Sequence, residues 1–174
     1  MTISEQLILP DTNWYIFQFQ VNQDKFKELF DRDQPKALTA DKIHKHFVDN
    51  HICVAINQKV IEEIKDICEK KKLYFDEVSI KEIAINFPGL NYTQNDINTI
   101  STWNAKITNP DEKFDEDDML IYVLCQRAGV NVIVTDNIRD FKRCKEVYQT
   151  NFPDAISINI WNFDDAINNL GVND

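Results

Sequence analysis

The chain has 174 residues, a hydrophobic fraction of 43% and a formal net charge of −10 at pH 7. We expect a single domain over residues 1–174, because this length can bury a core without disulfides or a structural metal. The negative charge disfavours non-specific DNA binding through a broad basic face, and it disfavours an anionic membrane as a partner. The start of the chain lacks a secretion signal and no apolar run reaches membrane-spanning length, so we expect a cytoplasmic protein.

The cysteines and histidines do not indicate zinc. No two of the four cysteines form a CxxC pair. His44 and His46 are two positions apart and would not share a helix face. We therefore expect reduced cysteines in the core and histidines on solvated helix surfaces.

The first third of the chain begins with an apolar run over residues 6–9 that is stopped by Pro10 and Asp11. This pattern predicts a strand, a tight joint and a helix that is capped by Asp11 or Thr12. Further helices are expected over residues 24–31 and 36–49. A buried strand over 51–56 follows, and then a helix that is capped by Asn57.

The rest of the chain is least regular over residues 73–114, where Pro88-Gly89 interrupts the pattern and only residues 96–107 indicate a helix. An apolar helix is expected over 115–127, stopped by Gly129, and then strands over 130–134 and 156–160 and a helix over 163–170. Alternating strands and helices predict an α/β three-layer sandwich with a mainly parallel central sheet. The strands that end at Leu9, Ile56 and Val134 should share it.

Acidic residues stand where strands are expected to end. Asp11 follows the first strand, and the carboxyl edge of a parallel sheet is where open α/β sheets bind ligands. A helix cap is the alternative role for Asp11. On the helix after Asn57, Glu63 borders the apolar stripe and can reach a site beside the core, whereas Glu62 fits a solvated face.

A second group of acids precedes the most apolar helix. Favourable interaction with the helix dipole explains a couple of the acids over residues 111–118. Asp115 and Asp118, however, share a helix face, and Asp118 directly precedes Met119 and other apolar residues. A carboxylate beside buried apolar groups is costly unless a cation or hydrogen bonds compensate it. Asp118 is therefore the best single candidate for a metal-site acid.

The last motif is Thr135-Asp136-Asn137, after the expected strand over 130–134. Thr135 can orient a carboxylate or water, and the other two residues offer oxygen ligands; an Asx-turn is the alternative. Several cations follow, and they either contact substrate phosphate or form a solvated helix face. These cations include Arg139, Lys142 and Arg143.

Four segments together resemble the PIN-domain nucleases, metal-dependent ribonucleases that include the VapC-type toxins. They are LILPDTN, ICVAINQKVIEEI, DEDDMLIYVLCQRAG and VIVTDNIRDF, and they cover somewhat under half of the chain in the family's order. The resemblance implies a Rossmann-like topology with Asp11, Glu63 and Asp118 as core acids and Asp115 as an extra acid. The last segment departs from the family pattern, because Asn137 fills the customary acid slot and Asp136 could substitute for it.

These features predict an endoribonuclease that depends on Mg²⁺ or Mn²⁺, because carboxylate oxygens select hard cations over zinc. The expected catalytic residues are Asp11, Glu63, Asp118 and Asp136; the expected metal ligands add Asp115 and Asn137, and the accessory positions are Asn13 and Thr135. The expected partners are RNA, an antitoxin protein and a second copy of the chain. The main alternative is a non-catalytic PIN-like module that binds nucleic acid or protein. A phosphatase is less favoured, because Asn13 replaces its usual second Asp.

Overall fold

The computed structural model describes residues 6–172, without the side chains of residues 86–89. It confirms the α/β class. The described elements, in chain order, are β1 (Ile8–Pro10), α1 (Thr12–Asn22), the 3-10 turn η2 (Phe26–Glu28), α2 (Gln34–Asp49), β2 (Val54–Asn57), α3 (Gln58–Lys71), α4 (Glu77–Ile83), β3 (Ala84–Leu90), α5 (Gln94–Lys106), the 3-10 turn η3 (Pro110–Glu112), α6 (Glu116–Ala128), β4 (Val132–Val134), α7 (Ile138–Asn151), β5 (Asn159–Trp161) and α8 (Phe163–Leu170).

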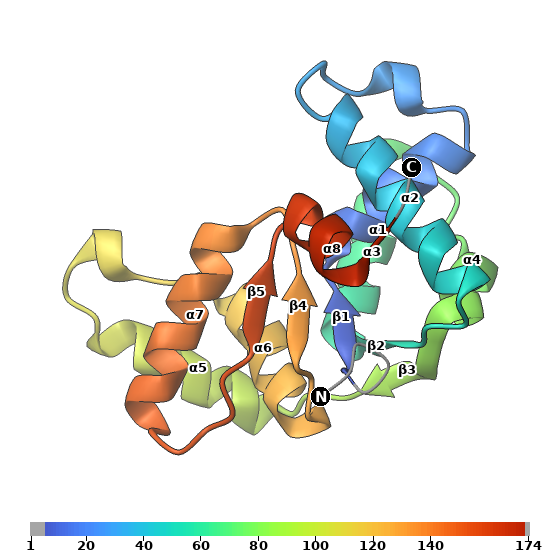
Figure 1. The fold of residues 1–174 in the computed structure, drawn as a ribbon. Helices are drawn as coiled ribbons and strands as arrows, with labels where there is room; N and C mark the ends of the chain where they lie inside the picture. Colours follow the sequence, from blue (N-terminus) through green and yellow to red (C-terminus); the bar gives the residue numbers. More distant parts are fainter. Residues whose placement is uncertain (1–5, 173–174) are drawn as a thin grey trace.

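The strands form two small sheets, and every pairing is parallel. One sheet has the order β1-β4-β5 (Figure 1), and the other pairs β2 with β3. The prediction that the strand ending near Ile56 shares a sheet with the other two is therefore wrong. β1 and β2 still lie close together, and Leu9, Ala55 and Ile56 from the two strands line a hollow of about 360 Å³.

The helices form two groups, which Figure 1 shows on either side of the three-stranded sheet. In one group α1 packs against α2 and α3, and α2 packs against α8; in the other, α6 packs against both α5 and α7. Trp14, Phe47 and Phe141 are fully buried between these elements. Among the described residues, no helix combines the length and the apolar character that crossing a membrane requires.

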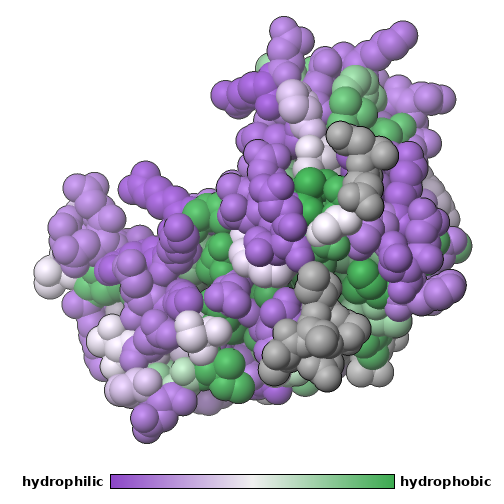
Figure 2. Space-filling model, in the orientation of Figure 1, coloured by the Kyte–Doolittle hydropathy of each residue, from purple (hydrophilic) through white to green (hydrophobic). Residues whose placement is uncertain are grey.

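The carboxyl ends of β1, β4 and β5 point toward the same edge, between the two helix groups (Figure 1). Figure 2 shows an indentation between the parts of the surface formed by α2 and α7, above these strand ends. The chain joints that follow β1 and β4 therefore open into the place where an α/β sheet binds its ligand.

Local sequence signals set several helix ends as expected. The Asn57 side chain accepts a hydrogen bond of 3.0 Å from the Val60 amide and caps α3. Gly129 ends α6 with a φ of 71°, a left-handed conformation that glycine adopts without strain. At the start of α5, where no cap was predicted, Thr93 and Asp96 form a reciprocal capping box, and the helix begins at Gln94.

Four local expectations need correction. Residues 24–31 contain the short turn η2 instead of a helix, and Asp24 at their start has a φ of 57° that breaks helical geometry. β3 runs through Pro88-Gly89, where its pairing with β2 changes register. The last strand begins only at Asn159. His44 is buried, with its ring centroid 5.7 Å from that of Trp14, so it is not on a solvated surface.

Candidate active site

Asp11 lies directly after β1 and is 4% exposed. Its amide continues the sheet by donating to the Val134 carbonyl at 2.9 Å. Its side chain makes no capping bond to α1 but accepts a 2.9 Å hydrogen bond from the Thr135 hydroxyl. Burial raises the pKa of Asp11 to about 6, although hydrogen bonds from Thr135 and the Thr12 backbone favour the ionised form.

Glu63 comes from α3 and reaches the same edge. One carboxylate oxygen accepts a 2.6 Å hydrogen bond from the hydroxyl of buried Thr12, the residue after Asp11. The other lies 3.8 Å from Lys59 Nζ, one helical turn away. Burial and the nearby charge of Asp11 raise the pKa of Glu63 to about 7, and Lys59 offsets only part of this effect.

Glu62 is adjacent in sequence but belongs to a different face. It accepts hydrogen bonds of 2.7 Å from the Gln58 amide and 2.8 Å from the Tyr92 hydroxyl. Glu62 is therefore half-buried and occupied by structural partners, and not freely solvated as expected. Glu63 is therefore assigned to the candidate site and Glu62 to a structural role, because their side chains bind different partners.

Asp118 lies in the first turn of α6 and is half-buried. The Asn137 side-chain amide donates a 2.9 Å hydrogen bond to its carboxylate. Burial, followed by the charges of Asp11, Asp115 and Glu63, raises the pKa of Asp118 to about 8. The three core acids named in the sequence analysis thus influence one another electrostatically although they come from three separate parts of the chain.

Asp115 and Asp136 lie at the periphery of this group. Asp115 caps α6 by accepting from the amides of Asp117 at 2.8 Å and Asp118 at 3.1 Å. Asp136 turns toward α2 and pairs with Lys36 at 3.0 Å. The joint after β4 is held by the Thr135 hydroxyl, which accepts from the Asn137 amide at 2.9 Å.

The described carboxylates do not form a ready metal cage: within residues 6–172, no group of three His, Cys, Asp or Glu side chains is arranged so that it could hold a metal ion. Like charges repel when no cation lies between them. The three core acids accept hydrogen bonds from Thr12, Thr135 and Asn137. The carboxylate oxygens of these acids are the kind of ligand atom that Mg²⁺ and Mn²⁺ prefer.

The remaining predicted residues lie farther out. Asn13 is exposed on the first turn of α1. Arg139 and Lys142 are exposed on α7, while Arg143 donates to the Glu112 carbonyl at 2.6 Å. Asp11, Glu63 and Asp118 therefore form the centre of the candidate site.

Three residues near the acids were missed from sequence. Lys59 lies 2.7 Å from Asp117 as well as beside Glu63, and its spacing of four residues from Glu63 was a usable signal. Thr12 was considered only as a helix cap. Lys36 gave no signal, because its contact with Asp136 joins residues that are 100 positions apart.

Comparison of the chain with known proteins gives no relative: no family model, no curated protein and no solved structure matches it.

Proposed function

We propose that the protein is a metal-dependent endoribonuclease that hydrolyses RNA phosphodiester bonds at Asp11, Glu63 and Asp118. One observation carries this proposal: burial, followed by the charges of neighbouring carboxylates, raises the pKa values of these acids to about 6, 7 and 8. Such a group is unfavourable by itself and gains free energy when a divalent cation binds. Perturbed acids at the carboxyl ends of strands are typical of functional sites.

The donor set has the oxygen chemistry that a hard divalent cation prefers, and the acids would have to rearrange to share one. Asp11, Glu63 and Asp118 would hold Mg²⁺ or Mn²⁺, with Asp115, Asp136 and Asn137 as outer oxygen donors. When bound, the metal would polarise the phosphate, lower the pKa of a bound water and neutralise charge in the transition state.

The neighbouring side chains would position the acids. The Thr135 hydroxyl fixes Asp11, the Thr12 hydroxyl fixes Glu63, and the Asn137 amide orients Asp118. Lys59 and Lys36 flank the acids through Asp117 and Asp136. Their charges reduce the repulsion that the acidic site exerts on an approaching phosphate.

The order of the four PIN-like segments supports the same activity. The proposal includes a PIN-like three-layer arrangement and the role of toxin in a toxin-antitoxin pair, with an antitoxin or a second copy of the chain as protein partner. Expression of wild type should then arrest growth of the host cell, and Asp11→Asn should relieve the arrest. Equal growth with both proteins would exclude the toxin role while leaving the nuclease activity to be judged in vitro.

The deciding experiment is RNA cleavage with Mg²⁺ or Mn²⁺. Asp11→Asn and Glu63→Gln should lower the rate by orders of magnitude, whereas the matched control Glu62→Gln should cleave like wild type. EDTA should abolish cleavage and added Mn²⁺ should restore it. Equal rates for Glu63→Gln and Glu62→Gln would contradict the proposed site. A phosphomonoester substrate in parallel identifies a phosphatase.

A non-catalytic binding module is the second candidate, and Asn137 is the observation that favours it. This residue stands in the slot where the resembling family carries an acid, and it donates to Asp118 as an amide. A binding module would retain RNA or protein binding in the presence of Mn²⁺ without any cleavage.

A further inference from the structure

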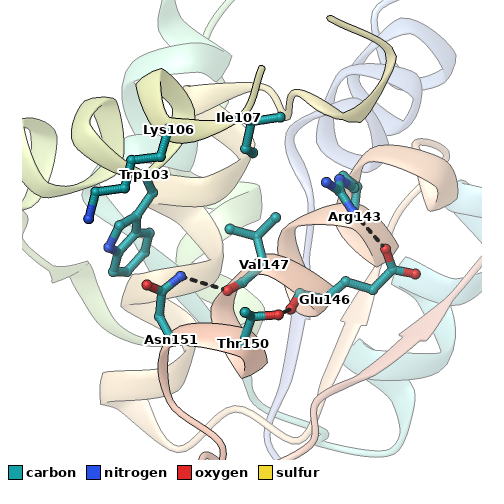
Figure 3. A pocket seen from close by; sticks show the side chains of 8 residues that line it. All are labelled: Trp103, Lys106, Ile107, Arg143, Glu146, Val147, Thr150 and Asn151. Carbon is teal, nitrogen blue, oxygen red and sulfur yellow. Dashed lines mark hydrogen bonds and ion pairs between the residues drawn. The ribbon is translucent and has the colours of Figure 1, made fainter. Parts of the chain in front are cut away.

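A separate groove lies between α5 and α7 (Figure 3). Trp103, Lys106 and Ile107 line it from α5 and the residue that follows, and Arg143, Val147 and Asn151 line it from α7. Its volume is about 240 Å³, smaller than the roughly 300–1,000 Å³ of pockets for drug-sized ligands. The groove therefore suits one flat ring system with a flexible chain that continues into solvent.

Trp103 gives the groove an aromatic wall. Its indole ring is half-buried and projects from α5 toward α7 in Figure 3. The rings of Tyr148 and Phe152 pack against it, with ring centroids 6.1 and 5.8 Å from that of Trp103. A tryptophan whose position is fixed in this way can stack a planar ligand with little loss of side-chain entropy.

Two cations line the groove: Lys106 lies beside the indole, and Arg143 lies across the groove from it, beyond Val147 (Figure 3). Lys106 is exposed and makes no hydrogen bond or ion pair with any residue in the described part of the chain. Arg143 is held in place by its bond to the Glu112 carbonyl and pairs with Glu146 at 3.2 Å. In a chain with a net charge of −10, this combination of aromatic and basic side chains is a local exception that favours a planar, anionic ligand.

One face of α7 leads from the acidic site toward the groove. Asp140, Arg143 and Val147 follow at steps of three and four residues, so they lie on one face of the helix. Asp140 at the start of this face acts electrostatically on Asp118. Asp140 and Val147 are seven positions apart, which corresponds to about 10 Å along the helix axis.

We propose that the α5–α7 groove binds single-stranded RNA next to the scissile bond, with one base stacked on Trp103 and phosphates bound by Lys106 and Arg143. This proposal rests on the ribonuclease activity proposed above, because it assigns the groove to the same strand. Stacking on an indole requires a base that is free of its partner strand, so a duplex should bind poorly. Glu146 would leave Arg143 when phosphate arrives.

The test measures binding without cleavage. A fluorescein-labelled eight-nucleotide RNA is titrated with the full-length protein in EDTA, and the Kd is read from fluorescence anisotropy. Trp103→Leu should weaken binding roughly 5- to 150-fold, as expected for the loss of one stacked base, while Trp103→Phe should retain most of the affinity. Glu146→Gln should tighten binding, because it removes the acid that competes for Arg143. A duplex of the same sequence should bind at least about ten-fold more weakly.

Lys106→Gln tests the phosphate contact separately. It should weaken binding and reduce the slope of log Kd against log salt by about 0.7, the value for one phosphate contact on a single strand. Lys70→Gln, in a remote ion pair with Asp66 on α3, is the matched control and should change neither quantity. Thermal unfolding of each variant verifies that it is folded.

The outcomes separate this proposal from the nuclease proposal. Groove-dependent binding without metal-dependent cleavage would support the groove and contradict the nuclease. Cleavage with an unchanged KM in Trp103→Leu and Lys106→Gln would support the nuclease and overturn the groove. An absence of saturable RNA binding by wild type would also overturn it, as expected if the groove serves a protein partner.

Discussion

Asn137 donates a 2.9 Å hydrogen bond from its side-chain amide to the carboxylate of Asp118. This hydrogen bond links the segment after β4 to the first turn of α6. It fixes the position of Asp118, whose pKa is raised to about 8. An acid at position 137 would place a like charge there in place of a donor. The amide thus stabilises the metal-free site in a way that a carboxylate could not.

The first prediction is that Asn137→Asp makes stability more dependent on metal. In EDTA the variant should have a lower Tm than wild type, because another carboxylate faces Asp118. Saturating Mn²⁺ should raise its Tm by more than it raises that of wild type, because the new acid adds a ligand. Thermal unfolding with and without Mn²⁺ measures both effects. A uniform drop in Tm that Mn²⁺ does not reverse would show that position 137 only holds the loop.

The second prediction concerns pH and Asp118. Its pKa is about 8 in the folded protein against 3.8 for an unperturbed Asp, so the folded state binds the proton more tightly. The stability of the metal-free protein should therefore fall as pH rises from about 4 to about 8. Asp118→Asn should remove this loss and be more stable than wild type at pH 8 by more than about 1.4 kcal/mol, the value of one pKa unit.

Urea unfolding in EDTA at pH 4 and pH 8 gives this difference, and cleavage assays should show that the same variant is inactive. Loss of stability at both pH values would mean that Asp118 makes a structural ion pair.

The third prediction uses Asp96 as a structural counterpart. Asp96 pairs with Arg127, and this partner lowers the pKa of Asp96 to about 2. The effect of pH on stability is therefore opposite to that of Asp118. The stabilisation that Asp96 contributes to the folded state is present above pH 3.8 and is lost as pH falls toward 2. Asp96→Asn should lower the free energy of unfolding at pH 7 by about 2 kcal/mol and leave the RNA cleavage rate unchanged. A large loss of cleavage would extend the site to α5.

The positions of the core acids could be predicted because local rules place them. Asp11 follows an apolar strand, and a helical period of 3.6 residues puts Glu63 at the border of an apolar stripe. The same period wrongly predicted a solvated Glu62, which Gln58 and Tyr92 hold. Contacts between segments that are distant in the sequence could not be predicted. The pairing of Lys36 with Asp136 and the bond from Thr12 to Glu63 depend on how α2 and α3 pack, for which no local pattern exists.

The arrangement of the sheets was also beyond local rules. The run over residues 51–56 predicts a buried strand, and β2 is one. Its hydrogen-bonded partner is β3 and not β1, although β1 lies close to it, and no local pattern in the sequence selects between the two. β3 was unrecognised, because Pro88-Gly89 reads as a break and only the change of register accommodates it.

The fourth prediction concerns the fully buried Thr135. Thr135→Val keeps the shape but removes the donor to Asp11 and the acceptor for the Asn137 amide. We expect a loss of about 2 kcal/mol in the free energy of unfolding and a fall of roughly 10- to 100-fold in cleavage rate or metal affinity. Urea unfolding, Mn²⁺ titration and RNA cleavage measure the three quantities.

Thr102→Val is the stability control, because Thr102 makes an exposed bond within its own helix at 2.8 Å, and it should change stability by less than about 0.5 kcal/mol. Unchanged cleavage in Thr135→Val would mean that Asp11 needs no orienting hydroxyl.

The fifth prediction is that Lys59→Gln changes stability and metal affinity in opposite directions. Lys59 Nζ lies 2.7 Å from Asp117 and 3.8 Å from Glu63, and its side chain is only 15% exposed. In EDTA its loss should lower the Tm, because Glu63 keeps its raised pKa without a nearby cation. Mn²⁺ should bind more tightly to the variant, because it no longer competes with the ammonium group. Thermal unfolding measures the change in Tm, and calorimetric titration with Mn²⁺ measures the change in metal affinity. Lys70→Gln should change neither quantity. Weaker Mn²⁺ binding in Lys59→Gln would instead make the lysine a supporting part of the metal site.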